Sequence, residues 1–163
     1  MELINIIVFS MIGAILMFRI QPFIYKQGLI WQPNQEDSQT TLESWVSGEY
    51  TMAALWIFAV SLLCTFVWYF MTSRSQAHRP KQIQQWRVCW AIIAVIPVLS
   101  IGVGIGFFNQ VSEMRLSLAV FFLIDILILF WLTTATSTPG LLIYTPPLAM
   151  ELRNLLSKLG VKE

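Results

Sequence analysis

The sequence predicts an all-α integral membrane protein with four transmembrane helices plus a C-terminal amphipathic surface helix. Of the 163 residues, 56% are hydrophobic and only 12% are charged, about half the charged fraction of a typical soluble domain. Four stretches are apolar enough to cross a bilayer, and a segment striped with leucine follows the last of them. The length indicates one domain, and the composition indicates a membrane as its solvent.

The predicted spans are residues 3–20, 51–72, 88–108 and 117–136. A helix needs roughly 20 residues to cross about 30 Å of hydrocarbon. The first span is uncharged only up to Phe18, so we expect the side chain of Arg19 to extend to the interface. Its N-terminus carries no Lys or Arg, so we interpret it as a retained helix rather than a signal peptide. Residues 1–140 are thus expected to form the transmembrane domain, with an outer loop over 21–50.

The distribution of Lys and Arg predicts the orientation of the chain. Most of the basic residues follow the second or the fourth span: Arg74, Arg79, Lys81, Arg87, Arg153, Lys158 and Lys162. We therefore expect both termini in the cytoplasm and the loop 21–50 on the opposite side. A bacterial inner membrane or a thylakoid-type membrane fits this composition.

Two helix starts are predicted outside the hydrocarbon. Thr40 and Glu43 have the spacing of a capping box, so a helix starting there could continue into the second span with a bend near Gly48. Pro80 fits the first position of the third helix, because that position needs no amide N–H.

The third span contains a proline and a pair of glycines at helical spacing. Pro97 removes an amide N–H and predicts a kink. Gly102 and Gly106 form a GxxxG pair, which lets another helix backbone approach closely. A static kink with a tight helix crossing is favoured over a moving hinge.

Asp125 is the one acidic residue within the four spans. A carboxylate at mid-membrane is costly, so Asp125 is expected to face the bundle and to have a polar partner. Counted by depth, Ser10, Ser61 and Ser100 of the other spans lie at a similar level. These four residues form the predicted intramembrane polar cluster. It either holds the helices together or binds a proton or cation.

The tail over residues 141–163 predicts a cytoplasmic amphipathic helix. Thr145 or Pro146 fits its N-cap, and Pro147 fits its first turn. Its leucines share one helix face: Leu148, Leu152, Leu155, Leu156 and Leu159. This face is expected to lie on lipid headgroups or to bind a partner protein.

The sequence offers little catalytic chemistry. No histidine lies in a span, which argues against a transmembrane haem protein. Cys64 and Cys89 are placed too differently in depth to form a pair, and no metal or nucleotide motif is present. A net charge of +1 argues against a nucleic-acid partner. An enzyme acting on lipid would need a polar cluster at one membrane interface, and the sequence shows none. We therefore expect no cofactor, no metal and no enzymatic activity.

Two function classes remain. The first is a small non-catalytic subunit or assembly factor of a larger membrane complex, as respiratory and photosynthetic complexes contain. It would meet the lipid bilayer and other membrane proteins through its aromatic-rich spans and its tail helix. The alternative is an oligomeric transporter or channel component in which Asp125 is the proton or cation site.

Overall fold

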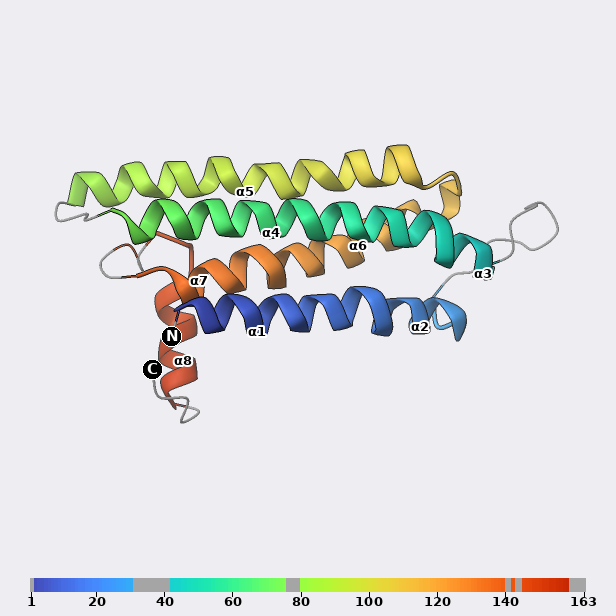
Figure 1. The fold of residues 1–163 in the computed structure, drawn as a ribbon, viewed down its shortest axis with the longest axis horizontal. Helices are drawn as coiled ribbons and strands as arrows, with labels where there is room; N and C mark the ends of the chain where they lie inside the picture. Colours follow the sequence, from blue (N-terminus) through green and yellow to red (C-terminus); the bar gives the residue numbers. More distant parts are fainter. Residues whose placement is uncertain (1, 31–41, 76–79, 140–141, 143–144, 159–163) are drawn as a thin grey trace.

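The computed structural model describes residues 2–30, 42–75, 80–139, 142 and 145–158. Within these ranges, four long helical segments run side by side as a bundle, and a short helix crosses one end (Figure 1). The four segments that are long and apolar enough to cross a membrane are Leu3–Lys26, Leu42–Ser73, Gln82–Phe108 and Ser112–Ser137. The predicted fold class is therefore confirmed.

Three of the four segments combine α-helix with a wider π-helical turn. The first is α1 (Glu2–Ile15), the π-turn η1 (Leu16–Ile20) and α2 (Gln21–Lys26). The second is α3 (Leu42–Trp45), the π-turn η2 (Val46–Tyr50) and α4 (Thr51–Ser73). The third is α5 (Pro80–Phe108). The fourth is the 3-10 turn η3 (Ser112–Met114), α6 (Arg115–Ile126), the π-turn η4 (Leu127–Leu132) and α7 (Thr133–Ser137).

The first segment is longer than its predicted span. The helix does not end at Ile20 but continues to Lys26, so residues 21–26 belong to the bundle and not to the outer loop. Pro22 lies in the first turn of α2, where its missing amide N–H is tolerated. Gln21 and Tyr25 of this extension are both buried.

The second segment also exceeds its predicted span. It begins at Leu42 and passes Gly48 within η2, so the helix expected to run from the loop into the span is present. The threonine of the predicted capping box, Thr40, lies outside the described residues. The third helix begins at Pro80, as predicted.

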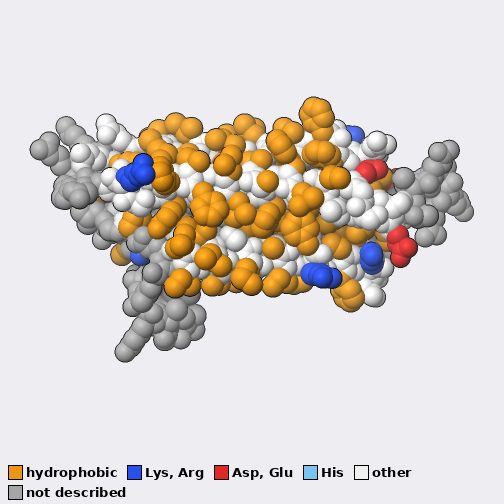
Figure 2. Space-filling model, in the orientation of Figure 1, with side chains coloured by type: hydrophobic (Ala, Val, Ile, Leu, Met, Phe, Trp, Pro, Cys, Tyr) orange, Lys and Arg blue, Asp and Glu red, His pale blue; other side chains and the backbone are white. Residues whose placement is uncertain are grey.

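The outside of the bundle is apolar. Hydrophobic side chains cover its middle on the face drawn in Figure 2, and charged side chains gather towards the two ends. Some of the exposed groups are large, such as Phe107 at 81% and Leu116 at 78% exposure. Contiguous apolar surface of this kind marks contact with lipid or with other membrane proteins. The chain is therefore a multi-pass membrane protein.

Tryptophan side chains form hydrogen bonds between helices at the end of the bundle where α4 ends and α5 begins. The indole N–H of Trp68 donates to Thr138 Oγ1 at 2.9 Å, and that of Trp90 donates to Thr134 Oγ1 at 3.1 Å. Both hydroxyls belong to the end of the fourth segment. These bonds join α4 and α5 to the end of the fourth segment. They also give hydrogen-bond partners to the indole N–H groups, which lipid hydrocarbon could not supply.

The tail helix α8 (Ala149–Lys158) lies across the bundle at the same end as the start of α1 (Figure 1). It begins after Pro147, so the prediction that Pro147 lies in its first turn is wrong by one or two residues. Leu148 precedes the helix with a φ of 61°.

Among the described side chains, the contact between α8 and the bundle is made by Ala149 and Arg153 and not by Leu148 or Leu155. Ala149 is buried, and the Arg153 guanidinium donates to the carbonyls of Ala135, Thr136 and Thr138 at 2.9–3.2 Å. Leu148 and Leu155 remain 64% and 59% exposed, and Leu152 is half-buried. The side chains of the other two predicted leucines, Leu156 and Leu159, lie outside the described residues.

Replacing Arg153 should release the tail helix. Its guanidinium satisfies carbonyls that the end of α7 leaves open, and bonds to a charged donor contribute about 1.5–3 kcal/mol. We expect Arg153→Gln to speed hydrogen exchange over residues 149–158 by at least about tenfold. Lys158→Gln, also on α8, is the matched control and should leave the exchange unchanged. Equal protection in both variants would contradict this role of Arg153.

Candidate functional site

The carboxyl of Asp125 on α6 is the fully enclosed acidic group among the buried polar residues of the described bundle. Its side chain is completely buried, at 0% exposure. The amide Nε2 of Gln21, on α2, donates to both carboxyl oxygens, at 2.8 Å to Oδ1 and 3.0 Å to Oδ2. Asp125 therefore has the polar partner that its depth requires, and the partner comes from the first helical segment.

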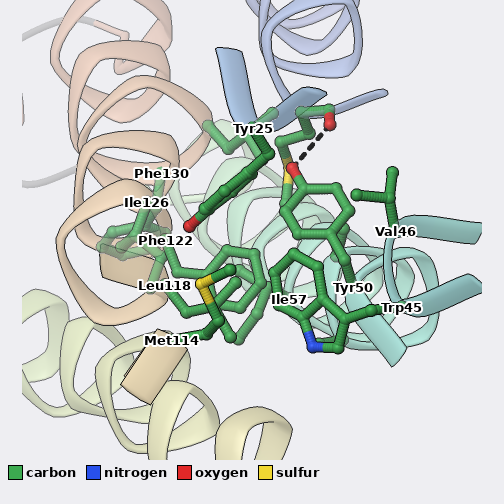
Figure 3. Packing of buried hydrophobic residues seen from close by; sticks show 14 of the residues in the cluster. Tyr25, Trp45, Val46, Tyr50, Ile57, Met114, Leu118, Phe122, Ile126 and Phe130 are labelled. Atoms are coloured by element: carbon green, nitrogen blue, oxygen red, sulfur yellow. Dashed lines mark hydrogen bonds between the residues drawn. The ribbon is translucent and has the colours of Figure 1, made fainter. Parts of the chain in front are cut away.

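The chain of hydrogen bonds continues from Gln21 to Tyr50 at the end of η2. The Tyr50 hydroxyl lies 2.7 Å from Gln21 Oε1 and 2.7 Å from the carbonyl oxygen of Met17, so its single proton is shared between two acceptors. Figure 3 shows the bond from Tyr50 to Met17 as a dashed line. One connected network thus joins the first, second and fourth segments.

The carbonyl of Met17 is free to accept because of the local sequence. In η1 the amide of Gln21 donates to Leu16, five residues back. With the same five-residue spacing, the Met17 carbonyl would accept from the amide of Pro22, but proline has no N–H. Met17 is therefore left without a helical donor, and the Tyr50 hydroxyl replaces it.

Similar replacements occur at the other two π-turns. Thr51 Oγ1 donates to the Val46 carbonyl at 2.7 Å in η2. In η4, the Leu129 carbonyl accepts from Thr65 Oγ1 of α4 at 2.8 Å. All three π-turns in the described ranges adjoin residues of the Asp125 network in sequence. Such wide turns occur frequently at functional sites.

Aromatic rings surround the Tyr50 side of the network (Figure 3). Tyr25 contacts Trp45, Tyr50 and Phe121 edge to face, with ring centroids 5.2–5.7 Å apart. Tyr50 also stacks on Phe122 at 6.1 Å. This packing fixes the position of the phenol that completes the network.

Two further hydrogen bonds anchor the aromatic rings to neighbouring segments. Tyr25 donates to Ser117 Oγ at 3.0 Å, and the Trp45 indole donates to Asn109 Oδ1 at 3.0 Å. Asn109 in turn donates to the Val111 carbonyl at 2.7 Å. The connection between α5 and α6 is therefore tied to α3.

The predicted serine partners do not bond to Asp125. The hydroxyls of Ser10 and Ser61 are buried, and the structure gives neither a hydrogen-bond partner. Ser100 donates to the carbonyl of Pro97 within its own helix at 2.6 Å. Depth alone placed these serines beside Asp125, but rotation about each helix decides which side chain meets it. Gln21 was missed because the predicted span ended one residue earlier.

The close helix crossing predicted at the glycine pair of α5 is not made within the described part of this chain and stays a prediction. Gly102 and Gly106 are exposed, and a Cβ atom added to either would meet nothing within 4 Å. Among the glycines of α5, Gly104 is the one that faces α4: an added Cβ would lie 3.5 Å from side-chain atoms of Trp56 and Ile57, which is ordinary van der Waals contact. The GxxxG pair therefore points away from the other helices of this chain. Pro97 lies within α5, which continues through it.

Comparison of the chain with protein-family models, with curated proteins and with solved structures gives no match. Within the described residues, no three His, Cys, Asp or Glu side chains group as a metal site would require. Cys64 is buried, Cys89 is half-buried, and neither is in a disulfide. The chemistry of the site is therefore that of one carboxyl, one amide and one phenol, which can hold a proton or join helices.

Replacing Tyr50 by Phe should destabilise the bundle. The substitution removes the proton shared by Gln21 and Met17 and leaves two buried acceptors without a donor, at about 1–3 kcal/mol. We expect a lower free energy of unfolding, measured by SDS titration in mixed micelles. Tyr69→Phe is the matched control, since its hydroxyl bonds to no described residue. Equal stability of both variants would show that the network contributes little.

Proposed function

We propose that this protein is a small non-catalytic membrane subunit or assembly factor of a larger membrane protein complex, as respiratory and photosynthetic complexes contain. The observation that carries the proposal is the outward position of Gly102 and Gly106 on α5. Glycines four residues apart expose helix backbone to close approach. Because no helix of this chain occupies that face, it is available to a helix of another subunit.

A shallow groove beside these glycines supports the same proposal. It has a volume of about 450 Å³ and lies between α4 and α5, lined by Trp56, Leu63 and Val67 on one side and by Ile96, Leu99 and Val103 on the other. In lipid, helices associate through close packing rather than through the hydrophobic effect. A ridge of side chains on a partner helix would fill this groove, with its backbone near the glycines.

The proposed orientation places both termini and α8 in the cytoplasm. Seven of the ten Lys and Arg residues lie on that side in this arrangement. The exposed Leu148 and Leu155 of the tail then face the membrane surface or a neighbouring subunit.

Substitution at Gly102 should prevent assembly without harming the fold. The Cβ atom of a leucine there meets nothing within 4 Å, and leucine favours helix over glycine by about 0.8–1 kcal/mol. We expect the wild-type chain, extracted gently from its native membrane, to migrate with a larger assembly in native electrophoresis. Gly102→Leu should migrate near the 18.7 kDa chain alone in its detergent micelle.

Gly48→Leu is the matched control for this experiment. Gly48 is also exposed and also has nothing within 4 Å of an added Cβ, but it lies on η2 and not on α5. It should keep the large assembly. A wild-type chain that migrates as a monomer or as a small homo-oligomer would contradict the subunit proposal.

A second candidate is an oligomeric transporter or channel component in which Asp125 binds a proton or cation. The observation that favours it is the enclosure of this carboxyl beside three π-turns. A buried carboxyl among movable helices is a common transport site. Its bidentate bond to Gln21 favours a structural role instead.

Substitutions of Asp125 distinguish the two candidates. Asn keeps the size and an acceptor oxygen for Gln21 but cannot titrate, whereas Leu leaves the Gln21 amide buried without an acceptor. For a structural role we expect Asp125→Asn to assemble normally and Asp125→Leu to fail, by native electrophoresis. An Asn variant that assembles fully but no longer restores growth of a deletion strain would favour transport.

A further inference from the structure

A cavity of about 540 Å³ opens where the tail meets the third helical segment. One wall is the start of the membrane-embedded part of α5, with Arg87, Trp90 and Ala91. The other wall is the chain leading into α8 and its first turn, from Thr145 to Glu151. Neither the Asp125 network nor the groove between α4 and α5 includes these residues.

The depth of this cavity corresponds to the lipid headgroups. Arg87 is the last charged residue before the uncharged, largely apolar stretch 88–108. Trp90 lies one turn deeper, stacked on Phe130 at 5.4 Å between ring centroids. A guanidinium followed by a half-buried indole is the arrangement expected at a membrane interface, where charged headgroups meet the hydrocarbon.

The walls combine polar and apolar groups. Arg87 carries planar N–H groups of the kind that bind phosphate, and the first turn of the ten-residue α8 adds the positive end of a helix dipole. Glu151 supplies one negative charge on the same wall. The two opposite charges together complement a headgroup that carries both a phosphate and an amine. Trp90, Pro147 and Leu148 offer apolar contact for the glycerol and acyl portions.

Leu148 adds a strained backbone to this wall. Its φ of 61° lies in the left-handed region that leucine rarely adopts, and its side chain is 64% exposed. Strained backbone of this kind clusters at active sites and ligand-binding segments. Here it holds an exposed apolar side chain at the rim of the cavity.

We propose that this cavity binds one phospholipid with a zwitterionic, amine-bearing headgroup. Arg87 and the first turn of α8 bind the phosphodiester, Glu151 binds the ammonium group, and Leu148 and Trp90 contact the apolar part. The lipid then lies between α5 and the tail helix and holds α8 against the membrane surface.

Native mass spectrometry of the purified, delipidated chain tests the proposal. The chain is incubated separately with phosphatidylethanolamine, phosphatidylglycerol, a diacyl glycolipid without phosphate, and inorganic phosphate. We expect one phosphatidylethanolamine adduct at least about fivefold more abundant than the other two lipid adducts. Equal retention of all three lipids, or an adduct of inorganic phosphate without any lipid adduct, would overturn the proposal.

Two variants and a control locate the site. Arg87→Gln should lose the preferred adduct, whereas Arg74→Gln should keep it, because Arg74 stacks over Phe70 and does not line the cavity. Leu148→Gly relieves the left-handed backbone and should fold at least as well. It should nevertheless retain at least about threefold less lipid. Wild-type retention in both Arg87→Gln and Leu148→Gly would place the lipid elsewhere and refute this site.

Discussion

The hydrogen bond between Gln21 and Asp125 is the constraint on which the arrangement of the bundle depends. Hydrocarbon offers no water to a buried carboxyl, so Asp125 must meet a donor from within the chain. The amide of Gln21 reaches both carboxyl oxygens, and its own oxygen accepts from Tyr50. A shift of any one of the three segments along its axis would separate these groups. Apolar contacts between helices allow several registers, whereas this chain of polar contacts allows one.

The π-turns follow from the same requirement. A regular α-helix satisfies all its internal carbonyls and leaves none for a neighbour. Widening the first segment at η1, next to Pro22, exposes the Met17 carbonyl to Tyr50, and widening the fourth at η4 exposes Leu129 to Thr65. Side-chain hydroxyls thereby form bonds between helices that backbone groups alone could not make. The irregular turns are thus part of how the helices are joined.

Much of the fold could be predicted from the sequence because the signals are local. Apolar runs give the spans, and Asp125 is recognisable as a lone charge within one of them. The partner of Asp125 was missed, since Arg19 and Pro22 resemble the end of a span. Their helix continues because the rest of the bundle buries Gln21 and satisfies the carbonyl that Pro22 leaves open. Likewise, spacing identifies a glycine pair in α5 but cannot say that Gly104, rather than the pair, faces α4. These features depend on helix rotation, which only tertiary contacts determine.

The polar network and the available surfaces lie in separate parts of the molecule. Asp125 is enclosed by its own chain, whereas the exposed glycines lie on the outer face of α5 and the tail cavity lies at one end. A partner helix on α5 would therefore bind without breaking the bonds that set the register of the other three segments. Arg153 has a comparable role at the tail, because it fixes α8 through backbone carbonyls while Leu148 and Leu155 stay exposed. Polar bonds inside the bundle set how its helices are joined and leave the apolar exterior free for other contacts. The proposed role as a subunit among other membrane proteins would require such an exterior.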